Sequence, residues 1–309
     1  MIYFIHTFEL TAFCETTRKY VSDEFKISTG IKVADYDDTH NRKIKLIVNP
    51  LKVLGSNDLE PEELIGKDIS KLFDKLEKKV DEYFDSAFKL SDFTLTRCDF
   101  TVNIDVGSQT RVSAYIKVLH NIGKVTGFSP KYKEKDYETR IDKDSSFDLV
   151  HSDGREFTAY NKLNQSKNTK AQGILRAEVR LKKPKAIFKY TNKSDTIEQI
   201  KDLSKQCEKI FMKTFCRIVP PGDHYIMKEA IKRIEDSVSK TRQREKMIRL
   251  LELTRNDSLN HALKKLKEKN YDRITAKFVE INMSPVTIRK KYGVKHLDSL
   301  YSYLGMITN

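Results

Sequence analysis

Three short segments contain side chains capable of catalysis, interspersed with apolar side chains. They are LTRCDFTVNID (95–105), FTAYNK (157–162) and LRAEVRL (175–181). Each has the composition of a β-strand, in which alternate residues share a face. Asp99 would then stand on a polar face, Glu178 would lie between two arginines, and Tyr160 would share a face with Lys162. Two carboxylates, a tyrosine and a lysine on strands that can pair indicate metal-assisted phosphoryl transfer with a tyrosine nucleophile.

The Asp99 strand has two faces of opposite character. Its polar face carries Arg97, Asp99, Thr101 and Asn103, and its apolar face carries Cys98, Phe100, Val102 and Ile104. The second set predicts the side that packs on the core. The polar set would be displayed above a buried sheet.

Segments around these strands predict an α+β fold. Residues 43–55 are typical of a strand that closes in a turn, and residues 68–89 and 108–123 carry apolar side chains at helical spacing. Asp153-Gly154 separates two strand-like runs and predicts a hairpin. The order β-α-β-α-β-β-β predicts an antiparallel or mixed sheet backed by two helices, in layers of ferredoxin-like type.

The pattern is helical from Thr196 onward and is interrupted by Pro220-Pro221-Gly222. We therefore predict two domains, 1–219 and 220–309, the second small, basic and all-helical. Within it Ser284 and Gly293 bracket a predicted short helix, with a further helix before it and another after it. This helix-turn-helix-like arrangement would place a basic helix in the major groove. The predicted contacts with DNA there are Thr287, Arg289, Lys290 and Lys291.

Charge points to a polyanionic partner. The chain has 309 residues, a formal net charge of +14 and 33% charged residues. Between Lys228 and Lys295 there are 19 Lys/Arg and 9 Asp/Glu, so most of the excess lies in the C-terminal quarter. Nucleic acid is the first candidate partner and an anionic membrane the second, although a solvated helical surface would also account for a run of this kind.

Targeting and redox signals are weak. The four cysteines, at 14, 98, 207 and 216, form no CxxC pair, which favours a reduced compartment. The first ten residues lack the basic and small-residue features of a signal peptide, and no apolar run approaches the length of a membrane span. We expect a cytoplasmic protein without membrane contact.

The ordered motifs resemble those of rolling-circle replication initiators, closest to the filamentous-phage (gene II) type and related plasmid initiators. Those proteins carry an R-x-D strand, then a Y-x-K strand, then an R-x-E-x-R strand. The matching residues here are Arg97 and Asp99, Tyr160 and Lys162, and Arg176, Glu178 and Arg180. The match covers roughly residues 43–190.

The resemblance implies a DNA strand-transferase that acts at an origin. A tyrosine attacks a phosphodiester and leaves a 5′-phosphotyrosine link and a free 3′-OH. Tyr160 would be the nucleophile, Lys162 would stabilise phosphate charge, and Asp99 and Glu178 would hold Mg²⁺ or Mn²⁺. Arg176 and Arg180 would bind DNA or pair with Glu178. The expected partners are single- and double-stranded origin DNA, with host replication proteins as further candidates.

Each of these residues also has a structural interpretation. Asp99 and Glu178 can be carboxylates paired with neighbouring arginines, and Tyr160 can be an ordinary strand tyrosine. Tyr132 and Tyr137, in the polar segment upstream, are alternative nucleophiles. The chain has no His-x-His pair, so the two-histidine metal site of many rolling-circle enzymes is absent, and His120 and His151 are isolated. The alternative function is therefore a DNA-binding replication or regulatory protein without catalysis. RNA binding is weaker, because no stacked-aromatic pattern is evident.

Overall fold

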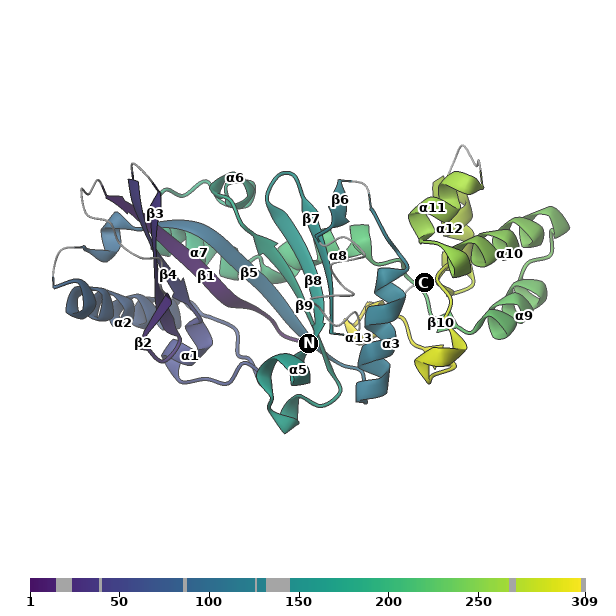
Figure 1. The fold of residues 1–309 in the computed structure, drawn as a ribbon, viewed down its shortest axis with the longest axis horizontal. Coiled ribbons are helices and arrows are strands. Elements are labelled where there is room, and N and C mark those ends of the chain that lie inside the picture. Colours follow the sequence, from purple (N-terminus) through teal and green to yellow (C-terminus); the bar gives the residue numbers. More distant parts are fainter. Residues whose placement is uncertain are drawn as a thin grey trace.

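The computed structural model describes residues 1–14, 24–38, 41–85, 88–125, 127–131, 145–266 and 271–306. Within these residues nine strands form one sheet, in the order β2-β3-β4-β1-β5-β9-β8-β7-β6 (Figure 1). Their bounds are β1 (Tyr3–Cys14), β2 (Glu24–Ser28), β3 (Ile31–Asp38), β4 (Asn41–Val48), β5 (Thr94–Asp105), β6 (Phe128–Pro130), β7 (Ser146–His151), β8 (Arg155–Asn161) and β9 (Ile174–Leu181). All neighbouring strands are antiparallel. The predicted α+β class is confirmed, and the sheet is the antiparallel alternative.

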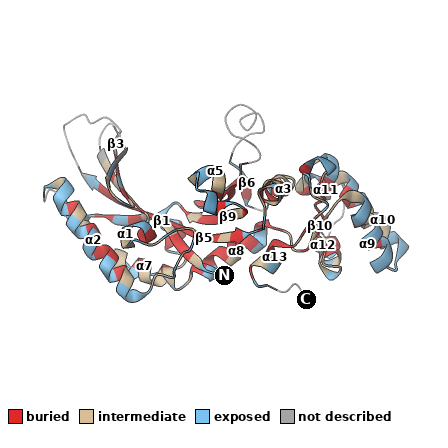
Figure 2. Cartoon of the chain, turned by 90° about the horizontal axis from the view of Figure 1, so that it is seen from below, coloured by how far each residue is buried: buried red, intermediate tan, exposed pale blue. Residues whose placement is uncertain are grey.

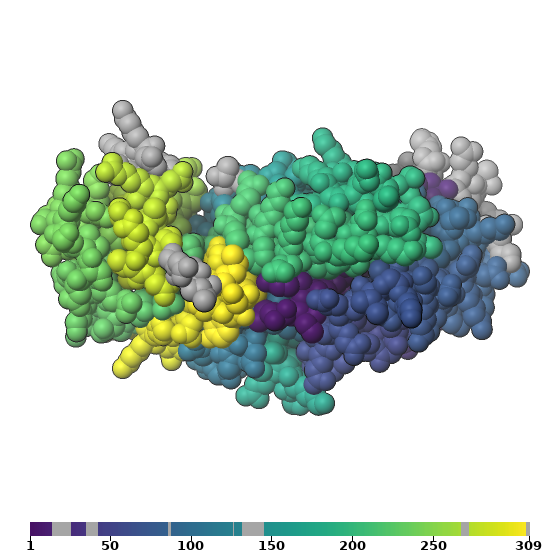
Figure 3. Space-filling view, turned by 180° about the vertical axis from the view of Figure 1, so that it is seen from behind, coloured from purple at the N-terminus to yellow at the C-terminus, as the bar shows by residue number. Residues whose placement is uncertain are grey.

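Helices cover one face of this sheet and leave much of the other open. The α-helices that precede the C-terminal part of the chain are α1 (Pro50–Leu54), α2 (Gly66–Phe84), α3 (Gln109–His120), α5 (Lys162–Ser166), α6 (Pro184–Ile187), α7 (Thr196–Ser204) and α8 (Cys207–Ile218). Figure 2 shows α2, α7 and α8 below the sheet, whereas α5 and the β2–β3 hairpin rise above it. From behind, α7 and α8 extend across the back of the sheet (Figure 3). The uncovered face is therefore available to a ligand.

The division into two faces follows from the alternation in β5. Cys98, Phe100, Val102 and Ile104 are fully buried on the helix side, as predicted, and helix α8 packs against β1, β5 and β9 there. Burial of each large apolar side chain contributes about 1.5–3 kcal/mol, so this layer fixes which face β5 turns toward the open side.

Local signals at the predicted helices and hairpin are confirmed. The hydroxyl of Ser108 caps α3 by accepting a hydrogen bond from the backbone N–H of Arg111. Strands β7 and β8 form the predicted hairpin through Asp153 and Gly154. Gly154 has a φ of +93°, a left-handed conformation that glycine adopts without strain.

Two boundaries differ from the prediction. The strand predicted to reach residue 55 ends at Val48, because Asn49 caps a short helix whose first residue is Pro50. The strand predicted to include Lys162 ends at Asn161, whose side chain accepts a hydrogen bond from Asn164 and so caps α5. In both places an asparagine supplies the N-cap that stops the extended run.

The C-terminal part forms a helical unit at one end of the molecule (Figure 1). It contains α9 (Met227–Ser237), α10 (Thr241–Asn256), α11 (Leu259–Lys265), α12 (Tyr271–Glu280), the two-residue strands β10 (His224–Tyr225) and β11 (His296–Leu297), and α13 (Leu300–Tyr303). The chain then returns to the sheet unit, where the hydroxyl of Tyr301 donates to the carbonyl of Val219 (2.8 Å). The boundary predicted at 219/220 stays a prediction.

The short helix predicted between Ser284 and Gly293 is wrong. Residues 283–288 form no helix: isolated bridges join Met283 to Asp223 and Ile288 to Ile226, with a bend between them, and the single 3₁₀ turn Lys290–Tyr292 follows. The sequence Val-Thr-Ile at 286–288 explains this, because β-branched side chains favour extended backbone. The helix-turn-helix-like arrangement is therefore not formed.

The four residues predicted to contact DNA from that helix are not on an α-helix, and their contacts with DNA stay a prediction. Thr287 is buried, and Arg289 is half-buried and donates to the carbonyl of Arg255 (2.9 Å). Lys290 and Lys291 are exposed, but they lie on the 3₁₀ turn rather than on a recognition helix.

No helix of the described residues is long and apolar enough to cross a membrane.

Candidate active site on the open face of the sheet

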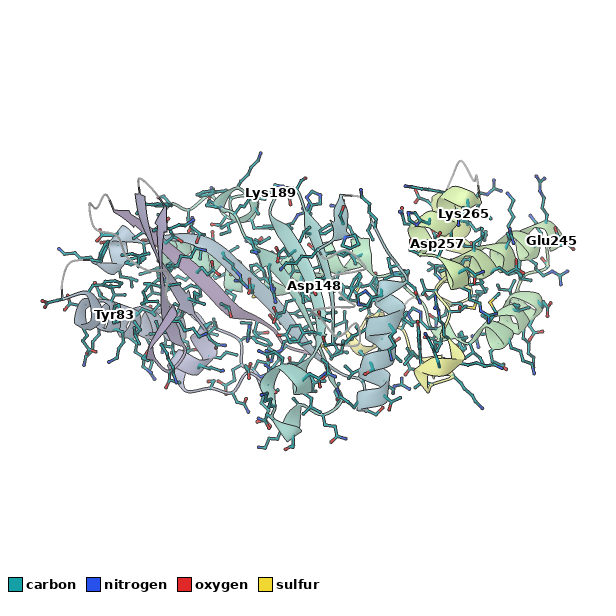
Figure 4. The ribbon with its side chains drawn as sticks, in the orientation of Figure 1. Tyr83, Asp148, Lys189, Glu245, Asp257 and Lys265 are labelled. Carbon is teal, nitrogen blue, oxygen red and sulfur yellow. The ribbon has the colours of Figure 1, made fainter. Side chains whose placement is uncertain are left out.

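Polar side chains line the open face of the sheet on five neighbouring strands. Strand register places Asp99 beside Arg180, Thr101 beside Glu178, and Asn103 beside Arg176. The next strand places Tyr160 beside Arg176 and Thr158 beside Glu178. Asp148 of β7 lies on this face (Figure 4) and accepts from Thr158 (2.9 Å). The three segments singled out by sequence are thus brought together at β5, β9 and β8.

Asp99 is held by an arginine of its own strand. Arg97 donates twice to it, Nε to Oδ1 (2.8 Å) and Nη2 to Oδ2 (2.6 Å), and donates once more to Glu9 of β1 (2.6 Å). Asp99 is 1% exposed. Burial raises its pKa above the ordinary value, although the charges of Arg97 and Arg180 act in the opposite direction.

Glu178 is the centre of the site. Its Oε1 accepts a hydrogen bond of 2.6 Å from the hydroxyl of Tyr160, and its Oε2 accepts from Arg180 Nη2 at 2.7 Å. Burial alone would raise its pKa, but the charges of Arg180 and His6 and the hydrogen bond from Tyr160 hold it at about 2. The carboxylate is therefore ionised at neutral pH.

Tyr160 is a neutral phenol in this arrangement. It is 9% exposed, and burial followed by the negative charge of Glu178 raises its pKa well above the usual value near 10. Its hydroxyl nevertheless lies at the wall of an open cleft of about 440 Å³, whose lining includes His6, Arg97, Asp99, Tyr160, Glu178 and Arg180. Acidic and basic groups thus surround one hydroxyl that a ligand in the cleft can approach.

Lys162 and Arg176 belong to a neighbouring buried cluster. Lys162 Nζ contacts Asp58 Oδ2 (2.9 Å), and so does Arg176 Nη1 (3.0 Å). Arg176 is fully buried and also donates to Asn103 (2.7 Å). It cannot reach a DNA backbone in this conformation, so the predicted contact of Arg176 with DNA is not supported. Arg180, by contrast, lines the cleft.

The charges in this cluster shift the pKa values of Asp58 and Lys162. Burial alone would raise the pKa of Asp58, but hydrogen bonding with His6 and the charges of Arg176 and Lys162 hold it well below its usual range. Burial and the nearby Arg176 lower the pKa of Lys162, despite the partner carboxylate. Sequence patterns gave no indication of Asp58, because it lies in the connection between α1 and α2.

His6 is the second residue that sequence patterns did not indicate. It stands at a register irregularity of β1 between Ile5 and Thr7, a bulge of the kind that redirects a side chain. Its Nδ1 lies 3.7 Å from Glu178 Oε1 and its Nε2 lies 3.4 Å from Asp58 Oδ2. The alternation of polar and apolar residues in FIHTFELTAF was the available signal. His120 and His151 bond instead to the Ser146 carbonyl and to Asp153.

A larger trough continues from the cleft. It has a volume of about 950 Å³, shares His6, Thr7 and Gln165 with the cleft, and runs beneath the β2–β3 hairpin and α1. Three exposed lysines line it: Lys26, Lys32 and Lys52. The open face therefore offers an elongated path with a basic side that leads to Tyr160.

A divalent cation at Asp99 and Glu178 would have to share these carboxylates with protein groups. All four oxygens of Asp99 and Glu178 already accept hydrogen bonds from Arg97, Arg180 or Tyr160. Among the described residues no group of three His, Cys, Asp or Glu side chains is arranged to hold a metal ion. The predicted metal ligation by Asp99 and Glu178 stays a prediction. Tyr132 and Tyr137, the alternative nucleophiles, lie outside the described residues.

No protein-family model, curated protein or solved structure matches this chain.

Proposed function

We propose that the protein nicks and rejoins one strand of DNA through a covalent link to Tyr160, as an initiator of rolling-circle replication with a fold of the replication-initiator type. The observation that carries the proposal is the hydroxyl of Tyr160, bonded to an ionised Glu178 beside Arg180 at the wall of an open cleft. Phosphoryl transfer needs a nucleophile, a proton acceptor and cations for the phosphate oxygens, and the cleft contains all three.

Arg97 and Arg180 are the cations that would receive the phosphate. Both line the cleft and both already bind carboxylates: Arg97 donates to the two oxygens of Asp99, and Arg180 donates twice to Oε2 of Glu178. A guanidinium group can bind phosphate oxygens in the same way. A phosphodiester entering the cleft would compete with Glu178 for Arg180. The guanidinium would then neutralise charge that develops on the phosphate oxygens.

Binding of phosphate to Arg180 in place of Glu178 would also activate Tyr160. In the free protein burial and the charge of Glu178 raise the pKa of Tyr160 well above its usual value, whereas Glu178 stays ionised, so a complete proton transfer from Tyr160 to Glu178 is strongly unfavourable. Arg180 is the strongest of the influences that lower the pKa of Glu178. When phosphate draws that cation away, the pKa of Glu178 rises and the carboxylate becomes a better proton acceptor.

The proposed step is balanced without a further reactant. The phenol oxygen of Tyr160 forms a bond to phosphorus, and the bond from phosphorus to the 3′ oxygen breaks. The phenol proton passes to Glu178 and then to the departing oxygen, which leaves a 5′-phosphotyrosine and a free 3′-OH. Attack by that 3′-OH reverses the step and rejoins the strand.

The trough would hold the single strand on either side of the scissile phosphate. Lys26, Lys32 and Lys52 would contact the backbone. We keep origin DNA as the proposed partner and Mg²⁺ or Mn²⁺ as a proposed requirement. The requirement is tested by running the reaction with each ion and with a chelator.

Covalent capture tests this function. The protein is incubated with single-stranded oligonucleotides that tile the DNA around its coding sequence, in Mn²⁺, and protein-linked DNA is separated on a denaturing gel. Wild type should give an adduct and Tyr160→Phe should give none. Tyr83→Phe is the matched control, because Tyr83 is exposed on α2, far from the cleft (Figure 4). If no oligonucleotide is captured by the wild type, the enzymatic proposal fails.

A second function is favoured by one specific observation. Every oxygen of Asp99 and Glu178 is already bonded within the protein, which is the arrangement expected of a DNA-binding protein that has the fold without the chemistry. That protein would bind DNA, bind no divalent ion at the cleft, and bind DNA as well when Tyr160 is replaced by phenylalanine. The capture experiment separates the two functions.

A further inference from the structure

A second basic surface lies on the C-terminal helical unit, away from the cleft. A groove of about 420 Å³ runs between α10 and α12 and is lined by Lys240, Arg242, Gln243, Lys246, Arg273, Ile274 and Lys277. Five of the seven lining residues are cations and none is acidic. We propose that this groove binds the phosphate backbone of double-stranded DNA.

The cations stand on both sides of the groove. Lys240 and Arg242, just before and within the first turn of α10, are exposed, and so is Arg273 across from them on α12. The floor is the buried Ile274. Residues 240–246 span roughly 9 Å of helix, which matches the rise of two to three phosphates along one strand at about 3.4 Å each.

Basic residues outnumber acidic ones in the two segments that form the groove. Residues 240–246 and 272–280 contain six Lys/Arg and three Asp/Glu. Of these, Glu280 pairs with Lys277 (2.6 Å), and Glu245 and Asp272 do not line the groove. The lining of the groove is therefore predominantly basic, like the C-terminal quarter of the chain as a whole.

Helix stability does not account for the charges on α10. Cations near the N-terminal end of a helix are disfavoured by the helix dipole, yet the first turn of α10 has no acidic residue and Lys240, Arg242 and Arg244 lie at its start. Their placement costs a little stability in the free protein. An anion in the groove would offset that cost.

The lining favours a duplex over a single strand. Proteins that hold single strands stack bases on aromatic side chains, and none of the seven lining residues is aromatic. Contacts made only by Lys, Arg and Gln suit backbone phosphates, which fix a duplex in place without reading its bases. The groove also lies at the opposite end of the molecule from the β2–β3 hairpin (Figure 1), so a duplex could bind there while a single strand occupies the trough.

This inference goes beyond strand cleavage, because a duplex can bind whether or not Tyr160 reacts. The test measures the affinity of the full chain for a fluorescent 30-base-pair duplex by anisotropy, from 50 to 300 mM salt. The variant carries Lys240→Gln and Arg242→Gln. Its matched control carries Lys71→Gln and Lys78→Gln, which remove the same charge from exposed positions on α2. Circular dichroism confirms that both variants are folded.

We expect the groove variant to bind the duplex about tenfold more weakly at 100 mM salt. The slope of log affinity against log salt should fall by about 2, close to 0.9 for each lost phosphate contact. The α2 control should keep both values near those of wild type. Equal affinity and slope in wild type and groove variant would overturn the proposal, as would an equal loss in the α2 control. It would also be overturned if the variant lost affinity for phosphatidylserine vesicles and not for the duplex.

Discussion

Replacing Arg97 with methionine tests whether this arginine neutralises the buried carboxylate of Asp99. Arg97 donates both of the hydrogen bonds that reach Asp99 and one more that reaches Glu9. Methionine has a similar length and removes the charge and all three bonds. Asp99 would remain almost fully buried, with only the more distant Arg180, at 3.8 Å, as a cationic neighbour.

We expect the free energy of unfolding to fall by about 3–5 kcal/mol at pH 7, the usual cost of leaving one partner of a buried ion pair uncompensated. Part of that cost should be relieved in the double variant with Asp99→Asn, because the stranded charge is then absent. A coupling of about 2 kcal/mol between the two positions would measure their interaction.

The loss should grow as pH rises. Burial already raises the pKa of Asp99 in the folded protein, and removal of Arg97 takes away a cation that lowers it. The folded variant then keeps a proton that the unfolded chain releases above about pH 4. The free energy of unfolding of the variant therefore falls as pH rises above about 4, by up to about 1.4 kcal/mol for each pH unit.

Urea unfolding followed by circular dichroism, at pH 5 and pH 8, measures both effects. Arg97→Lys is a useful companion, since it keeps the charge and loses the paired geometry. A cost below about 1 kcal/mol, a loss no larger at pH 8 than at pH 5, or full additivity with Asp99→Asn would each refute the argument that Arg97 neutralises a buried Asp99.

Three further substitutions test other contacts of the structure. Tyr160→Phe should lower the unfolding free energy by about 1.5–3 kcal/mol in urea titrations, since Glu178 loses a charged hydrogen bond; an unchanged midpoint would contradict that bond. Phe100→Ala should cost about 3–5 kcal/mol, because its side chain is fully buried under α8, and a thermal midpoint close to wild type would contradict the assigned face of β5. Gly222→Ala should cost about 2 kcal/mol or more, since φ is +93° and an added Cβ would lie 2.5 Å from the backbone of Met283; a neutral result in differential scanning calorimetry would argue against this close approach.

Short-range patterns predicted much of the sheet unit. The alternation around Asp99, the hydroxyl of Ser108 and the Asp153-Gly154 turn act within a few residues, and the structure has the strand, the helix and the hairpin that they indicate. The same alternation placed Asp99 and Glu178 on one face. Strand register then made them neighbours, which a single sequence does not specify.

Longer-range features were not predicted for physical reasons. Asp58 enters the site because the connection between α1 and α2 folds over the sheet, and His6 enters through a bulge in β1. No local spacing indicates Asp58, and the alternation around His6 does not specify the bulge that turns it into the site. Residues 284–293 contain good helix-start and helix-stop signals, but the backbone N–H groups of Ser284 and Ile288 donate to the carbonyls of Asp223 and Tyr225, and this tertiary pairing overrides the local signals.

Peptide mapping of the covalent adduct identifies the tyrosine that carries the DNA. After capture of a cleaved oligonucleotide, the DNA is trimmed by nuclease and the protein is digested with trypsin. Cleavage after Arg155 and Lys162 releases peptide 156–162, in which Tyr160 is the only tyrosine. Our account predicts the added nucleotide mass on this peptide. The same mass on the peptides that carry Tyr132 or Tyr137 would contradict it.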